Sequence, residues 1–226
     1  DFAKGRVSPV IAESPALSDM LDTNNDSVTS KRLGYSLITF KGAFKDSQAI
    51  SINSDAVVGD EYSYCDPDVM KQFNSRLTHS KYKHLIYFST PLLPGMGIDA
   101  EYAESRRHKR LCKCVHCGEW FWPSFLEHCR IPGHDVDWLS VTRSQLVQMP
   151  WQDTKIYCPK CGMEPDLSHE HRQWVCENNE SRNIAAGYAI IPFDVPSIIK
   201  PAYLAEKSVA YNRKIDWMQQ NLGMAA

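Results

Sequence analysis

Two Cys-x-x-Cys-Gly turns constrain the fold of this chain more than any other feature of its sequence. The first turn contains Cys114 and Cys117, and the second contains Cys158 and Cys161. A turn of this length directs both sulfurs to one side and exposes backbone N–H groups that stabilise thiolate charge. Two such turns supply the four sulfurs of a closed, tetrahedral, structural Zn²⁺ site. The sequence therefore predicts a zinc ribbon in the middle of the chain, with one zinc ion bound by these four cysteines.

Other assignments of the cysteines stay open at this point. The four cysteines of these turns could instead be four unrelated buried thiols, or form two disulfides in a secreted protein. The other four cysteines are irregularly spaced, which favours reduced thiols in a cytoplasm over a disulfide framework. These four are Cys65, Cys112, Cys129 and Cys176.

Several histidines lie close to cysteines and are alternative metal ligands. His116 lies inside the first turn, but with four cysteines available we expect it at the surface. Two further groupings match no standard ligand spacing, so we expect no second metal site from them. They are His128 with Cys129, and Cys176 with His169 and His171.

Length and composition place the chain among soluble globular proteins. Its 226 residues suffice for one good core or two modest domains, and its hydrophobic (43%) and charged (23%) fractions are ordinary. A net charge of −2 excludes a generally basic protein that coats nucleic acid, while leaving room for a local basic patch. No apolar run approaches the length of a membrane-spanning helix, so we expect no membrane contact.

The segment from residue 55 to residue 91 has the pattern of a β-α-β unit. Residues 55–61 form a short apolar run of the buried-strand type, and residues 84–91 form a second one. Between them, Asp66 and Pro67 open a helix that we expect to stop near residues 78–80. A strand, helix and strand at this spacing predict an α/β fold with a parallel sheet.

Two neighbouring acids, Asp60 and Glu61, follow the first of these strands, and Ser89 and Thr90 follow the second. Ligands of open α/β sheets bind at the carboxyl ends of strands. Phosphoryl-transfer motors use such a pair of acids, one to hold Mg²⁺ and one to polarise the attacking water. The hydroxyls of the next strand would lie beside the acids and sense the state of the nucleotide. The alternative is a solvated acidic loop without chemistry.

The phosphate-binding loop that such a motor needs is absent from the sequence. No Gly-x-x-x-x-Gly-Lys-Ser/Thr occurs in the 226 residues. We therefore expect this chain alone to be inactive towards ATP, and we interpret it as the central part of a longer protein.

The remaining segments predict a strand at residues 35–40, a helix at 98–110, a short helix at 140–149, a strand at 185–194 and helical structure at 198–222. The helix at 98–110 ends in a basic run that either grips DNA phosphates or forms a solvated helix end. The basic residues that we consider for DNA contact are Arg106, Arg107, Lys109 and Arg110. Trp120, Trp122 and Trp151 either stack on bases or supply the small core of a zinc ribbon.

The order of these motifs resembles the terminase large subunit of tailed bacteriophages, in the branch with a Cys-x-x-Cys zinc element. Residues 56–61 resemble its Walker B strand, and residues 86–91 resemble its coupling motif. The other matching pieces are Arg106-Arg107 leading into 114–118, then 157–162, Trp174-Val175, Gly187-Tyr188 and Asn221-Leu222-Gly223. Gly59 interrupts the apolar run, and Val115 replaces the proline of the first knuckle.

The resemblance implies a P-loop-type (ASCE) parallel-sheet ATPase with an inserted zinc ribbon and a C-terminal helical linker. It implies that Asp60 holds Mg²⁺ with bound ATP, that Glu61 is the catalytic acid, and that Ser89 and Thr90 couple hydrolysis to DNA movement. Three segments follow from it: 1–105, the C-terminal part of the ATPase domain; 106–184, the zinc-ribbon insertion; and 185–226, a returning strand and linker helices towards a nuclease domain outside this sequence.

The resemblance also implies the setting in which the protein works. Its partners would be double-stranded DNA, a portal protein, a small terminase subunit and like subunits in a ring, in the cytoplasm of a bacterial host. Two alternatives remain at this point. One is a stand-alone zinc-ribbon module that binds nucleic acid or protein without ATPase activity. The other is a helicase-like ATPase, which rarely has two such knuckles.

Overall fold

The computed structural model describes residues 2–50, 53–179 and 185–226. The chain forms two compact units, the first comprising residues 1–59 and 65–86 and the second residues 60–64 and 87–226. Each unit is described by itself.

The first unit begins with short helices and a β-hairpin. A proline at the first or second position begins each of the two α-helices near the N-terminus, which suits a residue without an N–H. The hairpin pairs β1 and β2 in antiparallel register and confirms the strand predicted at residues 35–40. The bounds are Ala3–Val7 for η1, Ser8–Glu13 for α1, Pro15–Ser18 for α2, Thr23–Asn25 for η2, Ser30–Leu33 for β1, Ser36–Thr39 for β2 and Asp46–Gln48 for η3.

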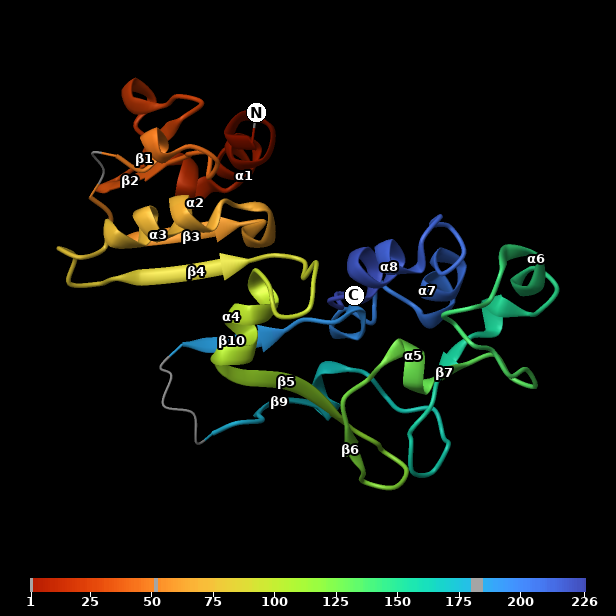
Figure 1. The fold of residues 1–226 in the computed structure, drawn as a ribbon. Coiled ribbons are helices and arrows are strands. Elements are labelled where there is room, and N and C mark those ends of the chain that lie inside the picture. The colour runs from red at the N-terminus through yellow and green to blue at the C-terminus, as the bar shows by residue number, and fades with distance from the viewer. Residues whose placement is uncertain (1, 51–52, 180–184) are drawn as a thin grey trace. The chain divides into compact units, whose positions relative to one another are not determined.

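The predicted β-α-β order is confirmed. It consists of β3 (Ala56–Asp60), α3 (Pro67–Ser75) and β4 (His84–Phe88). The side chain of Asp66 caps α3 by accepting hydrogen bonds from two N–H groups of its first turn. β3 and β4 pair with each other, the His84 N–H donates to the Asp55 carbonyl at their starts (3.0 Å), and their arrows point the same way in Figure 1.

The prediction that these two strands are buried is wrong. Val58 is 60% exposed, Ile86 44% and Phe88 58%. Among the described residues, β3 and β4 form a sheet of two strands only. A parallel sheet becomes buried when layers cover both of its faces, and a pair of strands offers little surface for such layers. The larger parallel sheet of a P-loop ATPase therefore stays a prediction.

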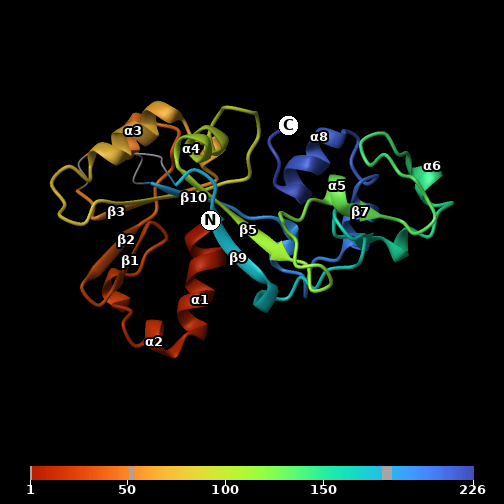
Figure 2. The same cartoon turned by 90° about the horizontal axis from the view of Figure 1, so that it is seen from below.

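A second sheet is built around β5 (Arg106–Lys113) in the second unit. β10 (Ala186–Ala189) pairs with it in parallel, while β9 (Arg172–Cys176) and β6 (Trp120–Phe121) pair with it in antiparallel register. β5 and β9 lie side by side in both Figure 1 and Figure 2. This sheet carries the basic run and the first cysteine turn.

The prediction of a helix over residues 98–110 is correct only for its first half. Helix α4 ends at Glu104, and the basic run lies on β5. Pairing on both edges of β5 supplies hydrogen bonds that override the helical propensity of arginine and lysine. The basic residues are therefore not a solvated helix end.

One hydrophobic core fills the second unit. The Phe125 ring lies 4.7 Å from that of Trp138 and 5.6 Å from that of Trp217, measured between ring centroids. Residues on both sides of position 184 contribute to this core. Position 184 itself, the predicted end of the zinc-ribbon insertion, lies outside the described residues. Trp151 packs against this core.

The remaining elements of the second unit are short. The prediction of helices after residue 198 is confirmed, and α7 begins at Pro201. None of the helices in the described part of the chain has the length and apolar character needed to cross a membrane. The bounds are Tyr62–Tyr64 for η4, Ile98–Glu104 for α4, Phe125–His128 for α5, Cys129–Arg130 for β7, Arg143–Leu146 for α6, Trp151–Asp153 for η5, Lys155–Ile156 for β8, His169–His171 for η6, Pro192–Asp194 for η7, Pro201–Lys207 for α7, Lys214–Trp217 for α8 and Met218–Leu222 for η8.

Candidate metal centre and acidic strand end

The two cysteine turns have the same backbone geometry. In each, the N–H of the first cysteine donates to the carbonyl two residues beyond the second cysteine (2.8 and 2.9 Å). The N–H of the following glycine donates back to the carbonyl of the first cysteine (2.9 and 3.0 Å). Gly118 and Gly162 adopt positive φ angles of 75° and 69°, which only glycine reaches without strain. Each Cys-x-x-Cys-Gly sequence therefore determines the turn that it forms.

The four sulfurs of these turns converge on one point. All lie within 4.8 Å of one another, with Cys114 Sγ 3.6 Å from Cys161 Sγ and Cys117 Sγ 3.7 Å from Cys158 Sγ. A zinc ion with Zn–S bonds of about 2.3 Å separates its tetrahedral sulfurs by about 3.8 Å. The donor set and spacing therefore fit Zn²⁺. The same distances exceed a disulfide bond of about 2.05 Å, so the alternative of two disulfides does not hold.

The electrostatics of the cluster also favour a cation. Burial raises the pKa of the Cys114 thiol, but the N–H groups of His116 and Cys117 outweigh it and lower this pKa to about 6. The Glu119 N–H lowers the pKa of Cys117, but burial and the neighbouring thiols outweigh it and raise this pKa to about 12. Four adjacent thiolates are therefore mutually destabilising unless a positive ion lies between them, and a Zn²⁺ ion would supply that charge.

The histidines near these turns have other contacts. His116 is exposed, and its Nε2 lies 3.1 Å from the Glu164 carbonyl oxygen. The Nδ1 of His128 accepts a hydrogen bond from the Ser124 N–H (3.0 Å). Within the described ranges, the four-cysteine cluster is the one group of three or more metal-binding side chains that converge.

The acidic strand end lies beside the end of β4. Asp60 is the last residue of β3, and Glu61 follows with a φ of +52°, a left-handed conformation that is rare for a residue with a side chain. The Ser89 hydroxyl accepts a hydrogen bond from the Ser63 N–H (3.0 Å) and donates to the Thr90 carbonyl (3.1 Å). The predicted acids and hydroxyls therefore belong to segments that are directly hydrogen-bonded.

An aromatic contact strengthens this junction. The rings of Tyr62 and Tyr87 stack with centroids 4.0 Å apart, and the Tyr62 hydroxyl donates to Glu101 Oε1 (2.8 Å). Strand β4 is thus joined through η4 to the residues that follow the acids. Sequence analysis did not identify these tyrosines as part of the junction.

Two of the four basic residues considered for DNA contact are held in internal ion pairs. Lys109 Nζ lies 2.8 Å from Glu177 and 4.3 Å from the centroid of the Trp122 ring. Arg110 lies 3.8 Å from Asp194. Arg106 and Arg107, on the same strand, are partly buried. DNA contact by these residues stays a prediction.

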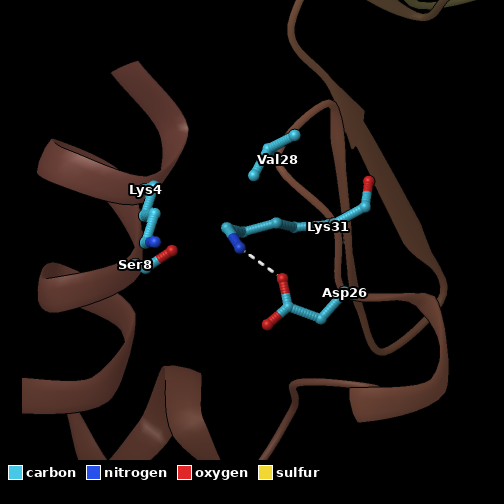
Figure 3. Close-up of a pocket in the computed structure, with 6 residues that line it drawn as sticks. Lys4, Ser8, Asp26, Val28 and Lys31 are labelled. Carbon is cyan, nitrogen blue, oxygen red and sulfur yellow. Dashed lines mark hydrogen bonds and ion pairs between the residues drawn. The ribbon is translucent and has the colours of Figure 1, made fainter. Parts of the chain in front are cut away.

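The first unit contains a small pocket of about 200 Å³ that sequence analysis did not predict. Figure 3 shows Lys4 and Ser8, from the N-terminal helix, facing Asp26 and Lys31 across it. Lys31 is buried and forms an ion pair with Asp26, which compensates its charge.

These features define an α/β protein with an acidic strand end and a four-cysteine cluster whose geometry fits a metal ion. Residues 1–182 match the family model described as phage terminase large subunit gpA, ATPase domain. Because this match covers most of the chain, the chain belongs to that family, and the resemblance predicted from the sequence is confirmed. None of the curated proteins and none of the solved structures matches it.

Proposed function

We propose that this chain is the part of a terminase large subunit that carries the Walker B strand, the coupling strand and a zinc ribbon. In the complete protein it would use ATP to drive double-stranded DNA into a procapsid. The family match over residues 1–182 is the observation that supports this proposal most directly. It favours the motor over a stand-alone zinc-ribbon module.

The proposed chemistry uses the two acids after β3. Bound ATP would supply the phosphoryl group, and Mg²⁺ would neutralise the negative charge on its phosphates. The Asp60 carboxylate would bind the metal, and a Glu61 carboxylate oxygen would accept a proton from the attacking water. The unusual φ of Glu61 supports a functional role, since such conformations cluster at active sites.

Ser89 and Thr90 are the proposed coupling residues. The hydrogen bond from the Ser63 N–H to the Ser89 hydroxyl joins the turn after the acids to the end of β4. A change in the turn when ATP is hydrolysed would therefore be transmitted to β4. Thr90 follows directly, and its carbonyl accepts a hydrogen bond from the Ser89 hydroxyl.

The zinc ribbon has a structural role in this proposal. Cys114, Cys117, Cys158 and Cys161 would bind one Zn²⁺, which joins two turns 40 residues apart in the sequence. Several further parts of the interpretation remain proposals. They are the three segments 1–105, 106–184 and 185–226, and a nuclease activity from a further domain. They also include the partners: a portal protein, a small subunit and like subunits in a ring. Arg106, Arg107, Lys109 and Arg110 as DNA contacts, and the host cytoplasm as the site of action, are proposals too.

The test is DNA-stimulated ATP hydrolysis by the full-length protein. Glu61→Gln keeps the size of the side chain and removes the proton acceptor, so the rate should fall about 10²- to 10⁴-fold. Binding of a fluorescent ATP analogue should persist. Glu13→Gln, the same change at an exposed position, is the matched control and should keep the full rate. Unchanged hydrolysis in Glu61→Gln would rule out the assigned role.

A further inference from the structure

The turn that follows Glu61 is held against the start of α4. The Ser63 side chain is half-buried, and its hydroxyl oxygen accepts a hydrogen bond from the N–H of Ile98, the first residue of α4 (3.2 Å). Gly97, which precedes α4, lies so close that a Cβ on it would be 2.8 Å from Ser63 Oγ and 3.0 Å from Ser63 Cα. Glycine suits this position because it has no Cβ and because its φ of +57° is rare for other residues. We call this the Ser63–Gly97 contact.

Further hydrogen bonds hold the same turn. The Tyr62 hydroxyl donates to Glu101 Oε1 on α4 (2.8 Å). The Tyr64 N–H donates to the Glu61 carbonyl (2.8 Å), which closes the turn on itself. The two residues that follow Glu61, Tyr62 and Ser63, are therefore both tied to α4.

Helix α4 is in turn fixed to the β5 sheet. Asn178 joins the end of the helix to β5, because its amide donates to the Ser105 carbonyl (2.9 Å) and its side-chain oxygen accepts from the Arg107 N–H (2.7 Å). Tyr102 of α4 packs so closely on β10 that a Cβ on Gly187 would lie 2.8 Å from its Cδ2. The helix is therefore a firm support for the turn.

The backbone of Glu61 shows why such a support matters. Its φ of +52° lies in the left-handed region, which is unfavourable for a residue with a side chain. A conformation of this kind persists when the surrounding structure enforces it. The bonds from Tyr62 and Ser63 to α4 supply that constraint. Without it, the backbone of Glu61 would return to a negative φ, and its carboxylate would point in another direction.

We propose that Ser63 and Gly97 are positioning residues for Glu61, and that their contact keeps its carboxylate directed at the attacking water. This inference rests on the proposed function, in which Glu61 accepts the proton of that water. Ser63 and Gly97 act through the backbone of the turn and have no contact with the nucleotide in this scheme. Their loss should therefore lower kcat and leave the binding of ATP unchanged.

The first experiment measures ATP hydrolysis by the full-length protein with two matched glycine variants. Gly97→Ala places a methyl group against Ser63 and should lower kcat about 10²-fold at an unchanged KM for ATP, because a displacement of about 1 Å costs that much. Gly95→Ala is the control, since Gly95 also has a positive φ (+72°) but a Cβ there meets nothing within 4 Å, and it should keep the full kcat. The stoichiometry of bound fluorescent ATP analogue counts the folded sites in each variant. Equal kcat values per folded site in the two variants would overturn the proposal.

A double variant separates positioning from general damage to the fold. If Gly97 acts only through Glu61, then Glu61→Gln with Gly97→Ala should hydrolyse ATP as fast as Glu61→Gln alone, because the proton acceptor is already absent. A further loss in the double variant would overturn the proposal.

The single variants distinguish this inference from the proposed function. Unchanged hydrolysis in Glu61→Gln would remove the role assigned to Glu61, and the positioning role with it. Lost hydrolysis in Glu61→Gln together with full hydrolysis in Gly97→Ala would overturn the positioning role alone and leave the proposed function in place.

Discussion

The zinc-ribbon region and the β3–α3–β4 region both contain short strands with β-branched apolar residues and differ in how these residues are buried. Ile156 in β8 is 3% exposed, while Val58 in β3 is 60% exposed. The main hydrophobic core consists entirely of residues from position 112 onwards. Among the described residues of the first unit, the buried apolar ones are few, and they include Ala49, Val69 and Met70.

The difference shows two ways of making a short strand stable. Around the metal centre, two cysteine turns and a surrounding core hold strands of two residues in place. A parallel pair such as β3 and β4 instead depends on neighbouring strands and on layers over both faces. Apolar character alone therefore does not decide burial. What decides it is whether a second surface is available.

The largest expected effect is the loss of zinc. Cys158→Ser should abolish metal binding and unfold the second unit, because structural zinc binds with about 10–16 kcal/mol and a whole domain has a net stability of only about 5–15 kcal/mol. Metal analysis should give about one zinc per wild-type chain and none for the variant, with a collapse of the near-UV signal of the tryptophans. Cys65→Ser, outside the cluster, is the control and should retain zinc. A metal-free protein that stays folded would contradict the structural role.

The next largest effect should come from a buried ion pair. The Arg172 side chain is 1% exposed, and it donates to Asp194 (2.6 Å) and to the Phe193 carbonyl (2.6 Å). Arg172→Met leaves the Asp194 carboxylate buried with one of its charge partners gone, which should cost about 3–5 kcal/mol. Urea unfolding followed by tryptophan fluorescence measures this loss.

An exposed ion pair in the same unit is the control for that measurement. Arg213 bonds to Asp216, and its side chain is 72% exposed. Arg213→Met should therefore cost no more than about 1 kcal/mol. Equal losses of unfolding free energy in the two variants would show that the burial of Arg172 does not determine how much its ion pair stabilises the protein.

A smaller effect is expected at Gly187 in β10. A Cβ at this position would lie 2.1 Å from Ser105 Oγ and 2.8 Å from Tyr102 Cδ2. Gly187→Ala should therefore force α4 away from the sheet and cost about 1–3 kcal/mol. Adding Ser105→Ala should restore part of the loss. Gly42→Ala, which meets nothing within 4 Å, should change stability by less than about 0.5 kcal/mol.

Parts of the structure that a local rule decides are predictable from the sequence. The spacing of the cysteine pairs predicted that the four sulfurs converge, and Asp66 with Pro67 predicted the start of α3, because turns and helix caps depend on adjacent residues. The order of strand, helix and strand was likewise correct.

Parts of the structure that depend on contacts between distant residues are not predictable in this way. The run of arginines and lysines after residue 105 reads as a helix, but its pairing with β9 and β10 makes it a strand. The ion pair of Arg172 with Asp194 and the meeting of His108 with Tyr188 join residues 22 and 80 positions apart, in a register that the sequence does not reveal. Trp174 and Tyr188 stand in apolar runs of the sequence, but no local pattern indicates which face of a sheet they share.

The smallest predicted effect concerns Val58 in β3, and it is compared with the effect of the same kind of change at Ile156 in β8. Val58→Ala should change the free energy of unfolding by less than about 0.5 kcal/mol, because the side chain is largely exposed. Ile156→Ala removes a buried side chain from the core and should cost about 2–5 kcal/mol. Both changes shorten a β-branched residue in a strand, so chemistry is held nearly constant while burial differs. Chemical denaturation of both variants in the zinc-loaded chain gives the two numbers. If Val58→Ala instead lost about 2 kcal/mol or more, which is the loss expected for Ile156→Ala, then β3 would be covered in solution. The two regions would in that case be stabilised alike.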